Sequence, residues 1–247
     1  MKVKNRLLIL VGLCLISLTI LFTPVIQADL YIQGKRHTEA FTIMGQTNPE
    51  KDETLITWMS KDKYRNDSGQ ESSFIVRLDK NKIYHLDHTK KSYSMIDLPV
   101  DLSKILPPQA QQMMQMFKMT AAVTDTGETK KIKDWNCRKY LVDLKGAMMS
   151  MNMEIWATKD LELDYETYQK FSDSVMSLNP MFKDIFDEIK KIDGYRVLSF
   201  STVSIMGTSY KVSEEIIDVQ EKSAPSGTYD IPEGYTQVEF NPMERKG

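Results

Sequence analysis

The chain has 247 residues and carries 32 lysines and arginines against 34 acidic residues, which is a net charge of −2. Basic and acidic residues are interleaved along the chain and form no concentrated basic stretch, so we expect no nucleic-acid partner. The length suffices for a sizeable core, and no proline-, glycine- or serine-rich linker divides the chain.

Residues 1–28 are typical of a signal peptide for export. Cations without acids precede an unbroken apolar run over residues 7–22, and Ala28 supplies a small residue at a plausible cleavage point. We therefore predict that residues 1–28 are removed and that residues 29–247 form a single domain, with 29 basic residues against 34 acidic ones. An uncleaved segment that anchors the protein in a membrane is the alternative.

The cysteines predict a fold without an internal disulfide. Cys14 lies inside the export segment and leaves with it, so Cys137 is alone in the mature chain. Its thiol is expected either to be buried in a strand or to pair with another molecule. Packing alone must then hold the mature domain together.

After residue 28, short alternating segments separated by turn residues predict antiparallel strands with one buried face. The predicted strands cover residues 30–45, 53–66, 72–79, 82–87, 91–98, 121–132, 136–145, 148–157, 196–206, 208–220 and 235–240. Several are joined by tight turns, which is typical of a meander. We therefore predict an α+β, mainly β fold with a single strongly curved antiparallel sheet.

Two segments have helical periodicity instead. The first begins at Pro107-Pro108 and includes an apolar stripe of Ala110, Met113, Met114, Phe117 and Ala121. The second covers residues 164–194, and Asn179-Pro180 divides it into two helices because proline in a helix interior costs about 3 kcal/mol. Their stripes are Tyr168, Phe171, Val175 and Leu178, then Phe182, Ile185, Phe186 and Ile189, with Gly194 as the final C-cap.

Methionine is unusually frequent, with 16 residues. Four lie on the first predicted helix, and Met149, Met151 and Met153 share one face of a strand because strand side chains alternate. Thioether side chains repack easily and suit sites for variable hydrophobic ligands. Three interpretations remain open: plain core packing, a lipophilic cavity, and capture of cuprous ion by thioethers.

The chain shows no sequence motif of an enzyme, a metal site or a cofactor site. His85 and His88 straddle a predicted hairpin and are expected at the turn surface, while His37 stands alone. Glu214 and Glu215 point to opposite faces of a strand and cannot act together. We therefore expect a protein that is not an enzyme and that needs neither metal nor cofactor.

Several short strings carry a family resemblance through their order and spacing: Lys63-Tyr64-Arg65, Arg77-Leu78-Asp79, Ile83-Tyr84, Lys91-Ser92-Tyr93, Cys137-Arg138-Lys139-Tyr140, residues 154–161 and residues 229–235. Over most of residues 30–240 the chain resembles an uncharacterised bacterial family of exported proteins with an outer-membrane lipoprotein carrier-like fold. The resemblance implies a periplasmic half-barrel whose apolar concave face is covered by helices. In carriers of that type, the concavity holds acyl chains.

These observations lead to the hypothesis of a monomeric, non-enzymatic periplasmic binding or carrier protein for a lipid, lipoprotein or other hydrophobic ligand. The residues expected to line its cavity are Met113, Met116, Phe117, Met149, Met151, Met153, Phe182 and Phe186. The alternative is a cell-envelope interaction module with a filled core, which docks a protein partner through a strand edge or a helix face. A methionine-based copper(I)-binding protein is the third hypothesis.

Overall fold

The computed structural model describes residues 28–101, 109, 119–161, 163–178 and 185–240. The predicted signal peptide and its cleavage point therefore lie outside the described residues, except for Ala28. Within the described part of the chain, no helix is long and apolar enough to span a membrane.

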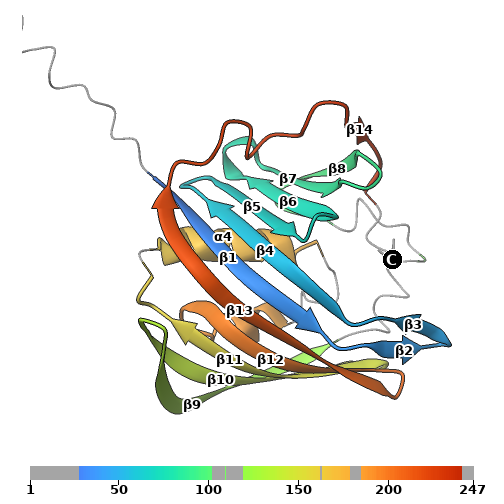
Figure 1. The fold of residues 1–247 in the computed structure, drawn as a ribbon, viewed down its shortest axis with the longest axis vertical. Helices are drawn as coiled ribbons and strands as arrows, with labels where there is room; N and C mark the ends of the chain where they lie inside the picture. Colours follow the sequence, from blue (N-terminus) through green and yellow to red (C-terminus); the bar gives the residue numbers. More distant parts are fainter. Residues whose placement is uncertain (1–27, 102–108, 110–118, 162, 179–184, 241–247) are drawn as a thin grey trace, which may run out of the picture.

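The protein is mainly β (Figure 1). Its strands are β1 (Asp29–Thr38), β2 (Phe41–Ile43), β3 (Gln46–Asn48), β4 (Lys51–Met59), β5 (Lys63–Ser68), β6 (Ser72–Arg77), β7 (Lys82–Asp87), β8 (Ser92–Asp97), β9 (Thr120–Ile132), β10 (Trp135–Lys145), β11 (Met149–Thr158), β12 (Tyr195–Ile205), β13 (Thr208–Lys222) and β14 (Thr236–Gln237). A short 3-10 helix, η1 (Leu78–Lys80), joins β6 to β7.

Twelve of these strands form one sheet in the order β14-β8-β7-β6-β5-β4-β1-β13-β12-β11-β10-β9, and β2 pairs with β3 separately. The sheet is not closed, because β14 and β9 lie at its two edges. Neighbouring strands are antiparallel except that β14 runs parallel to β8. One large sheet is thus confirmed, whereas a purely antiparallel sheet is wrong at this edge.

Two predicted strands are each divided by a turn. The predicted strand 30–45 becomes β1 and β2, and its end at Met44 and Gly45 forms the tip of the β2–β3 hairpin, with both residues at positive φ. The predicted strand 53–66 becomes β4 and β5, because Ser60 N–H donates to the Lys63 carbonyl at 2.8 Å and reverses the chain. The polar run Ser60-Lys61-Asp62-Lys63 and Gly45 were local turn signals that the prediction of two long strands passed over.

The longest described helix is α4 (Tyr165–Met176), and it begins where the sequence predicts. The Asp164 carboxylate caps it by accepting from the backbone N–H groups of Glu166 and Thr167, at 3.1 and 3.2 Å. The second described helix, α5 (Phe186–Ile189), is a single turn. The predicted helix after Pro107 and the break at Asn179-Pro180 lie outside the described residues, apart from isolated positions.

Two helix predictions are wrong. Ala121, which was assigned to a helical stripe, lies in β9. Gly194 is not a C-cap, since α5 ends at Ile189 and Gly194 directly precedes β12. Its φ of 123° and its closeness to Thr158 explain the glycine: a Cβ there would lie 2.6 Å from the Thr158 carbonyl oxygen.

The face of the sheet that the helices contact is called the helix-side face here. The buried ring of Phe171 from α4 stacks on Tyr64 of β5, with ring centroids 5.4 Å apart. Ile185 and Ile189 pack beside the strand methionines and the buried residues Tyr140, Val142 and Leu144 of β10. Figure 1 shows α4 lying across this face.

The opposite face of β6, β7 and β8 is covered by the segment that follows β13. Tyr229, Ile231 and Tyr235 pack there against the fully buried side chains of Ile75 and Leu86. The residues of this part of the sheet are therefore buried from both sides, which explains why apolar residues occupy consecutive positions in β6.

The predicted burial of Cys137 is confirmed: it lies in β10 with 1% of its surface exposed, and burial raises the pKa of its thiol. Trp58 also behaves as expected of a strand aromatic. It packs edge-on against its cross-strand neighbour Tyr31, with ring centroids 4.9 Å apart.

Candidate binding site

A space of about 380 Å³ lies over β11, β12 and β13 and is called the Met-lined space here. Met151 pairs with Val203 and Met153 with Ser201, so these four side chains share the helix-side face. The residues that line the space are Arg36, Thr38, Phe41, Glu53, Met151, Met153, Arg196, Ser199, Ser201, Val203, Tyr210, Val212 and Glu214. Apolar and charged side chains therefore meet in one hollow.

A second, smaller space of about 180 Å³ adjoins α4 and is called the Tyr-lined space. Its lining includes Tyr64, Tyr168 and Tyr195, and the rings of Tyr168 and Tyr195 lie 4.9 Å apart. Burial raises the pKa of all three phenols, so they remain protonated at neutral pH. These side chains offer hydroxyl groups as neutral hydrogen-bond donors.

Arg36, Arg196 and Glu214 line both spaces and are called the charged triad here. Arg36 and Glu214 are cross-strand partners of β1 and β13, which brings together positions 178 residues apart. The Arg36 Nε donates to Glu214 Oε1 at 2.7 Å, and an Arg196 Nη lies 3.3 Å from Glu214 Oε2. Each carboxylate oxygen of Glu214 thus faces one arginine.

The surroundings keep the charged triad ionised. Burial opposes ionisation of Glu214, but the attraction of Arg196 and Arg36 outweighs it and holds the pKa of the carboxyl below its ordinary value. Glu53, which lies 3.8 Å from Arg36, is itself paired with Lys51 at 3.1 Å. The Met-lined space is therefore lined by two guanidinium groups and two carboxylates, those of Glu53 and Glu214.

The predicted cavity residues are distributed unevenly. Met151 and Met153 line the Met-lined space. Met149 packs in the core cluster beside Ile185, and the half-buried Phe186 lies on α5; neither lines either space. The remaining predicted residues lie outside the described part of the chain: Met113, Met116, Phe117 and Phe182.

Sequence reasoning missed the charged triad. The alternation of β1 nevertheless contains a signal, because Arg36 is on the same face as the buried residues Leu30 and Ile32. A cation that continues the alternating series of buried residues along a strand is expected on the same helix-side face of the sheet. Its partners, however, come from strands more than 150 positions later.

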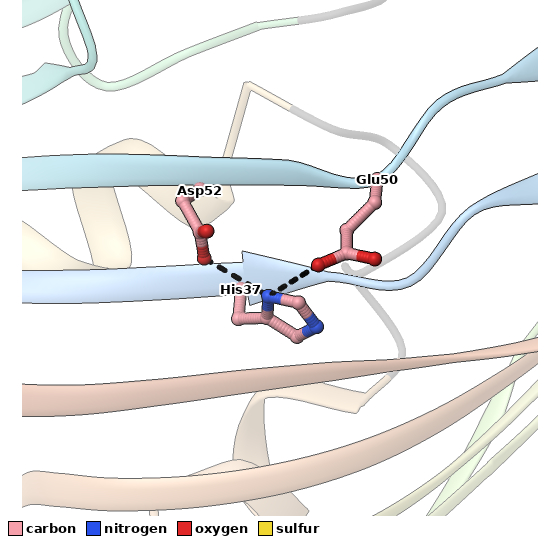
Figure 2. A group of neighbouring side chains, drawn as sticks. All are labelled: His37, Glu50 and Asp52. Carbon is pink, nitrogen blue, oxygen red and sulfur yellow. Dashed lines mark hydrogen bonds and ion pairs between the residues drawn. The ribbon is translucent and has the colours of Figure 1, made fainter.

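The sequence suggested that His37 stands alone, but the structure places two acidic side chains beside it. It faces Asp52 across β1 and β4, with 2.9 Å between Nδ1 and the carboxylate, and Glu50 lies 3.9 Å from the same nitrogen (Figure 2). The hydrogen bond to Asp52 raises the pKa of the exposed imidazole. The three donor groups lie within 4.8 Å of one another, but exposed carboxylates that stabilise a protonated histidine make a cross-strand ion pair rather than a built metal site.

His88 is half-buried rather than a surface turn residue, because the segment after β13 packs over it. Ser73 Oγ donates to the Asp67 carboxylate, so it must accept from His88 Nε2 at 2.5 Å. His88 Nδ1 is then free to accept from the Tyr235 hydroxyl at 2.6 Å. Burial, together with the charge of Arg65, lowers the pKa of His88.

A larger space of about 810 Å³ lies at the other end of β1, between the β4–β5 turn and residues 224–230. Its lining is strongly charged and of both signs: Asp29, Lys61, Asp62, Lys63, Arg77, Asp164, Glu221 and Asp230. It adjoins Ala28, before which the chain continues outside the described residues. None of the predicted cavity residues lines it, so the hollow around the charged triad is the better candidate site.

The fold and the hollow define a mainly β protein with one open sheet, whose helix-side face is partly apolar and partly charged. Residues 39–235 match the model of a family described as a domain of unknown function (DUF4412). The match covers most of the chain, and the chain belongs to this family. A search of the curated proteins finds no match.

Proposed function

We propose that this protein is a non-enzymatic binding or carrier protein of the periplasm, which holds a lipid, lipoprotein or other hydrophobic ligand in the Met-lined space. The observation that carries the proposal is an unfilled volume of about 380 Å³ beside Met151 and Met153. This volume lies within the range of small-molecule sites, roughly 300–1,000 Å³. Adaptable thioether side chains suit a ligand of variable shape.

In this proposal the 12-stranded sheet is a strongly curved half-barrel, and α4 and α5 cover its concave face. The contacts of Phe171 with Tyr64, and of the α5 region with the strand methionines, support this arrangement. The export segment supports a periplasmic location, since a signal peptide directs the mature chain out of the cytoplasm. The resemblance to a lipoprotein carrier-like fold supports the ligand class only by analogy, which is weaker than the site itself.

The space beside the strand methionines favours the carrier hypothesis over the docking module. A docking module needs a well-packed interior and an exposed edge or helix face. A carrier needs a recess for its ligand, and the partly open space of about 380 Å³ is consistent with one.

Native mass spectrometry tests the proposal on protein produced from the full-length chain and purified from an envelope fraction. We expect a stoichiometric hydrophobic adduct that solvent extraction releases. The double variant Met151→Asp and Met153→Asp should lose this adduct, because carboxylates in the apolar wall are costly to bury beside an acyl chain. Met206→Asp, at an exposed turn, is the matched control and should keep it.

A second variant guards against unfolding of the double variant. Ser201→Phe adds a ring to the wall of the Met-lined space and blocks it without adding charge. Circular dichroism reports whether each variant is folded. If folded Ser201→Phe and folded double variant both carry the adduct at the wild-type level, the assignment of the site is wrong.

A further inference from the structure

The charged triad marks a definite position within the hollow. It lines both the Met-lined and the Tyr-lined space, and so it lies where the two meet. On one side are the thioethers of Met151 and Met153, and on the other are the phenols of Tyr168 and Tyr195. The hollow is therefore apolar toward one end and rich in hydrogen-bond donors toward the other.

The two arginines differ in how fully their donors are used. Arg36 donates from Nε to Glu214 at 2.7 Å and from Nη1 to Ser68 Oγ at 3.3 Å. Arg196 makes no hydrogen bond to a described residue, and its contact is the 3.3 Å ion pair with Glu214. Its side chain is 45% exposed although it lines the hollow. A guanidinium group has five N–H donors, so Arg196 retains donors that face the open volume.

The phenols beside Arg196 also have unused hydrogen-bond donors. The hydroxyls of Tyr168 and Tyr195 make no hydrogen bond to a described residue, although both rings are packed against each other. Their raised pKa keeps them protonated, as donors. The only carboxylate of the charged triad, Glu214, already has both oxygens directed at arginines. The polar end of the hollow therefore offers the unused hydrogen-bond donors of Arg196 and of the two phenols.

Resting on the function proposed above, we propose that the ligand is an anionic amphiphile, whose carboxylate or phosphate headgroup binds Arg196 and whose chain lies along Met151 and Met153. The planar guanidinium fork matches both of these oxyanions in a bidentate manner. A cationic headgroup would have to compete with the arginines for Glu214 or with Lys51 for Glu53. An uncharged head would offer Arg196 no opposite charge and so could not form a bidentate charge-assisted pair.

Isothermal titration tests the proposal with four probes that share one chain, each used below its micelle concentration: dodecanoate, dodecyl phosphate, dodecanol and dodecyltrimethylammonium. Acetate and inorganic phosphate supply the charge without the chain. The protein is produced from the full-length chain and stripped of endogenous ligand. We expect dodecanoate and dodecyl phosphate to bind about tenfold or more tightly than dodecanol, the scale of one charge-assisted hydrogen bond.

Three variants assign the effect to the charged triad. Arg196→Gln should remove the preference for the anions while leaving dodecanol binding near its wild-type value. Glu214→Gln should strengthen anion binding, because it removes the carboxylate charge that lies against both arginines. Arg138→Gln is the matched control, since Arg138 is paired with Asp125 at 2.7 Å outside both spaces, and its variant should behave as the wild type.

The outcomes separate the two proposals. Equal affinity for the anions and for dodecanol, or tighter binding of the ammonium probe, overturns the anionic headgroup but leaves a hydrophobic ligand in place. Inorganic phosphate that binds as tightly as dodecyl phosphate shows a free-anion site and overturns the amphiphile. Failure of the wild type to bind any of the four chain-bearing probes refutes the proposed function and the headgroup assignment together.

Discussion

Phe171 is the most deeply buried side chain of α4. Phe171 is 1% exposed, and its ring stacks on Tyr64 with a centroid distance of 5.4 Å and an interplanar angle of 28°. Phe→Ala changes in protein cores cost about 3–5 kcal/mol, and an aromatic pair contributes roughly 0.5–1.5 kcal/mol beyond its buried area. We expect Phe171→Ala to lower the free energy of unfolding by about 3–5 kcal/mol, a large share of the stability of a typical domain.

Urea denaturation followed by circular dichroism measures this loss. The midpoint should fall while the slope with denaturant stays constant, provided that α4 unfolds together with the sheet. Phe200→Ala is the matched control: Phe200 is 50% exposed on β12, and its removal should cost under about 1 kcal/mol. A loss of less than about 1 kcal/mol for Phe171→Ala would show that α4 is not held by this contact, and would refute the reasoning.

Three further predictions follow from local contacts. Asp164→Ala removes the cap of α4 and should lower the urea midpoint by less than Phe171→Ala does; an unchanged midpoint would mean that the cap contributes nothing. Because the pKa of His88 in the folded protein lies below its ordinary value of 6.5, the unfolded chain takes up the proton first, so stability is full above about pH 6.5 and declines as the pH falls below it. The destabilisation by His88→Gln should therefore be smaller at pH 5 than at pH 8 in parallel urea titrations, and an equal loss at both would contradict the lowered pKa. Gly194→Ala should lower the melting temperature more than Gly207→Ala, since both positions have positive φ but only the Cβ at position 194 meets backbone atoms.

The local pattern of the sequence was sufficient for much of the sheet. The strands β6, β7, β8 and β9–β13 lie within a few residues of their predicted ranges, because alternation and turn residues are local properties. The same alternation correctly put Met151 and Met153 on one face, beside the hollow. The prediction failed at the turn after Met59 and at Met44-Gly45, where a polar run and a glycine mark reversals that the long predicted strands passed over.

The path of the segment after β13, which covers the face of β6–β8 opposite the helix-side face, could not be predicted from the sequence either. His88 was expected at a turn surface, but Tyr235, 147 residues later, covers it and donates to its ring. Likewise, His37 gains Asp52 as a partner only because β1 and β4 pair in one particular register. The pKa of His37 is therefore raised and that of His88 is lowered. Both shifts come from contacts between distant parts of the chain, which a local sequence pattern does not reveal.

The sequence by itself thus determined a mainly β protein, the start of α4, the buried thiol of Cys137 and the methionine face of β11. These follow from periodicity, capping and polarity, which act over a few residues. Only the tertiary structure decided that Arg36, Arg196 and Glu214 meet inside the hollow. The physical reason is that strand register between β1 and β13 is set by long-range pairing, where a shift of one residue would carry each side chain to the other face.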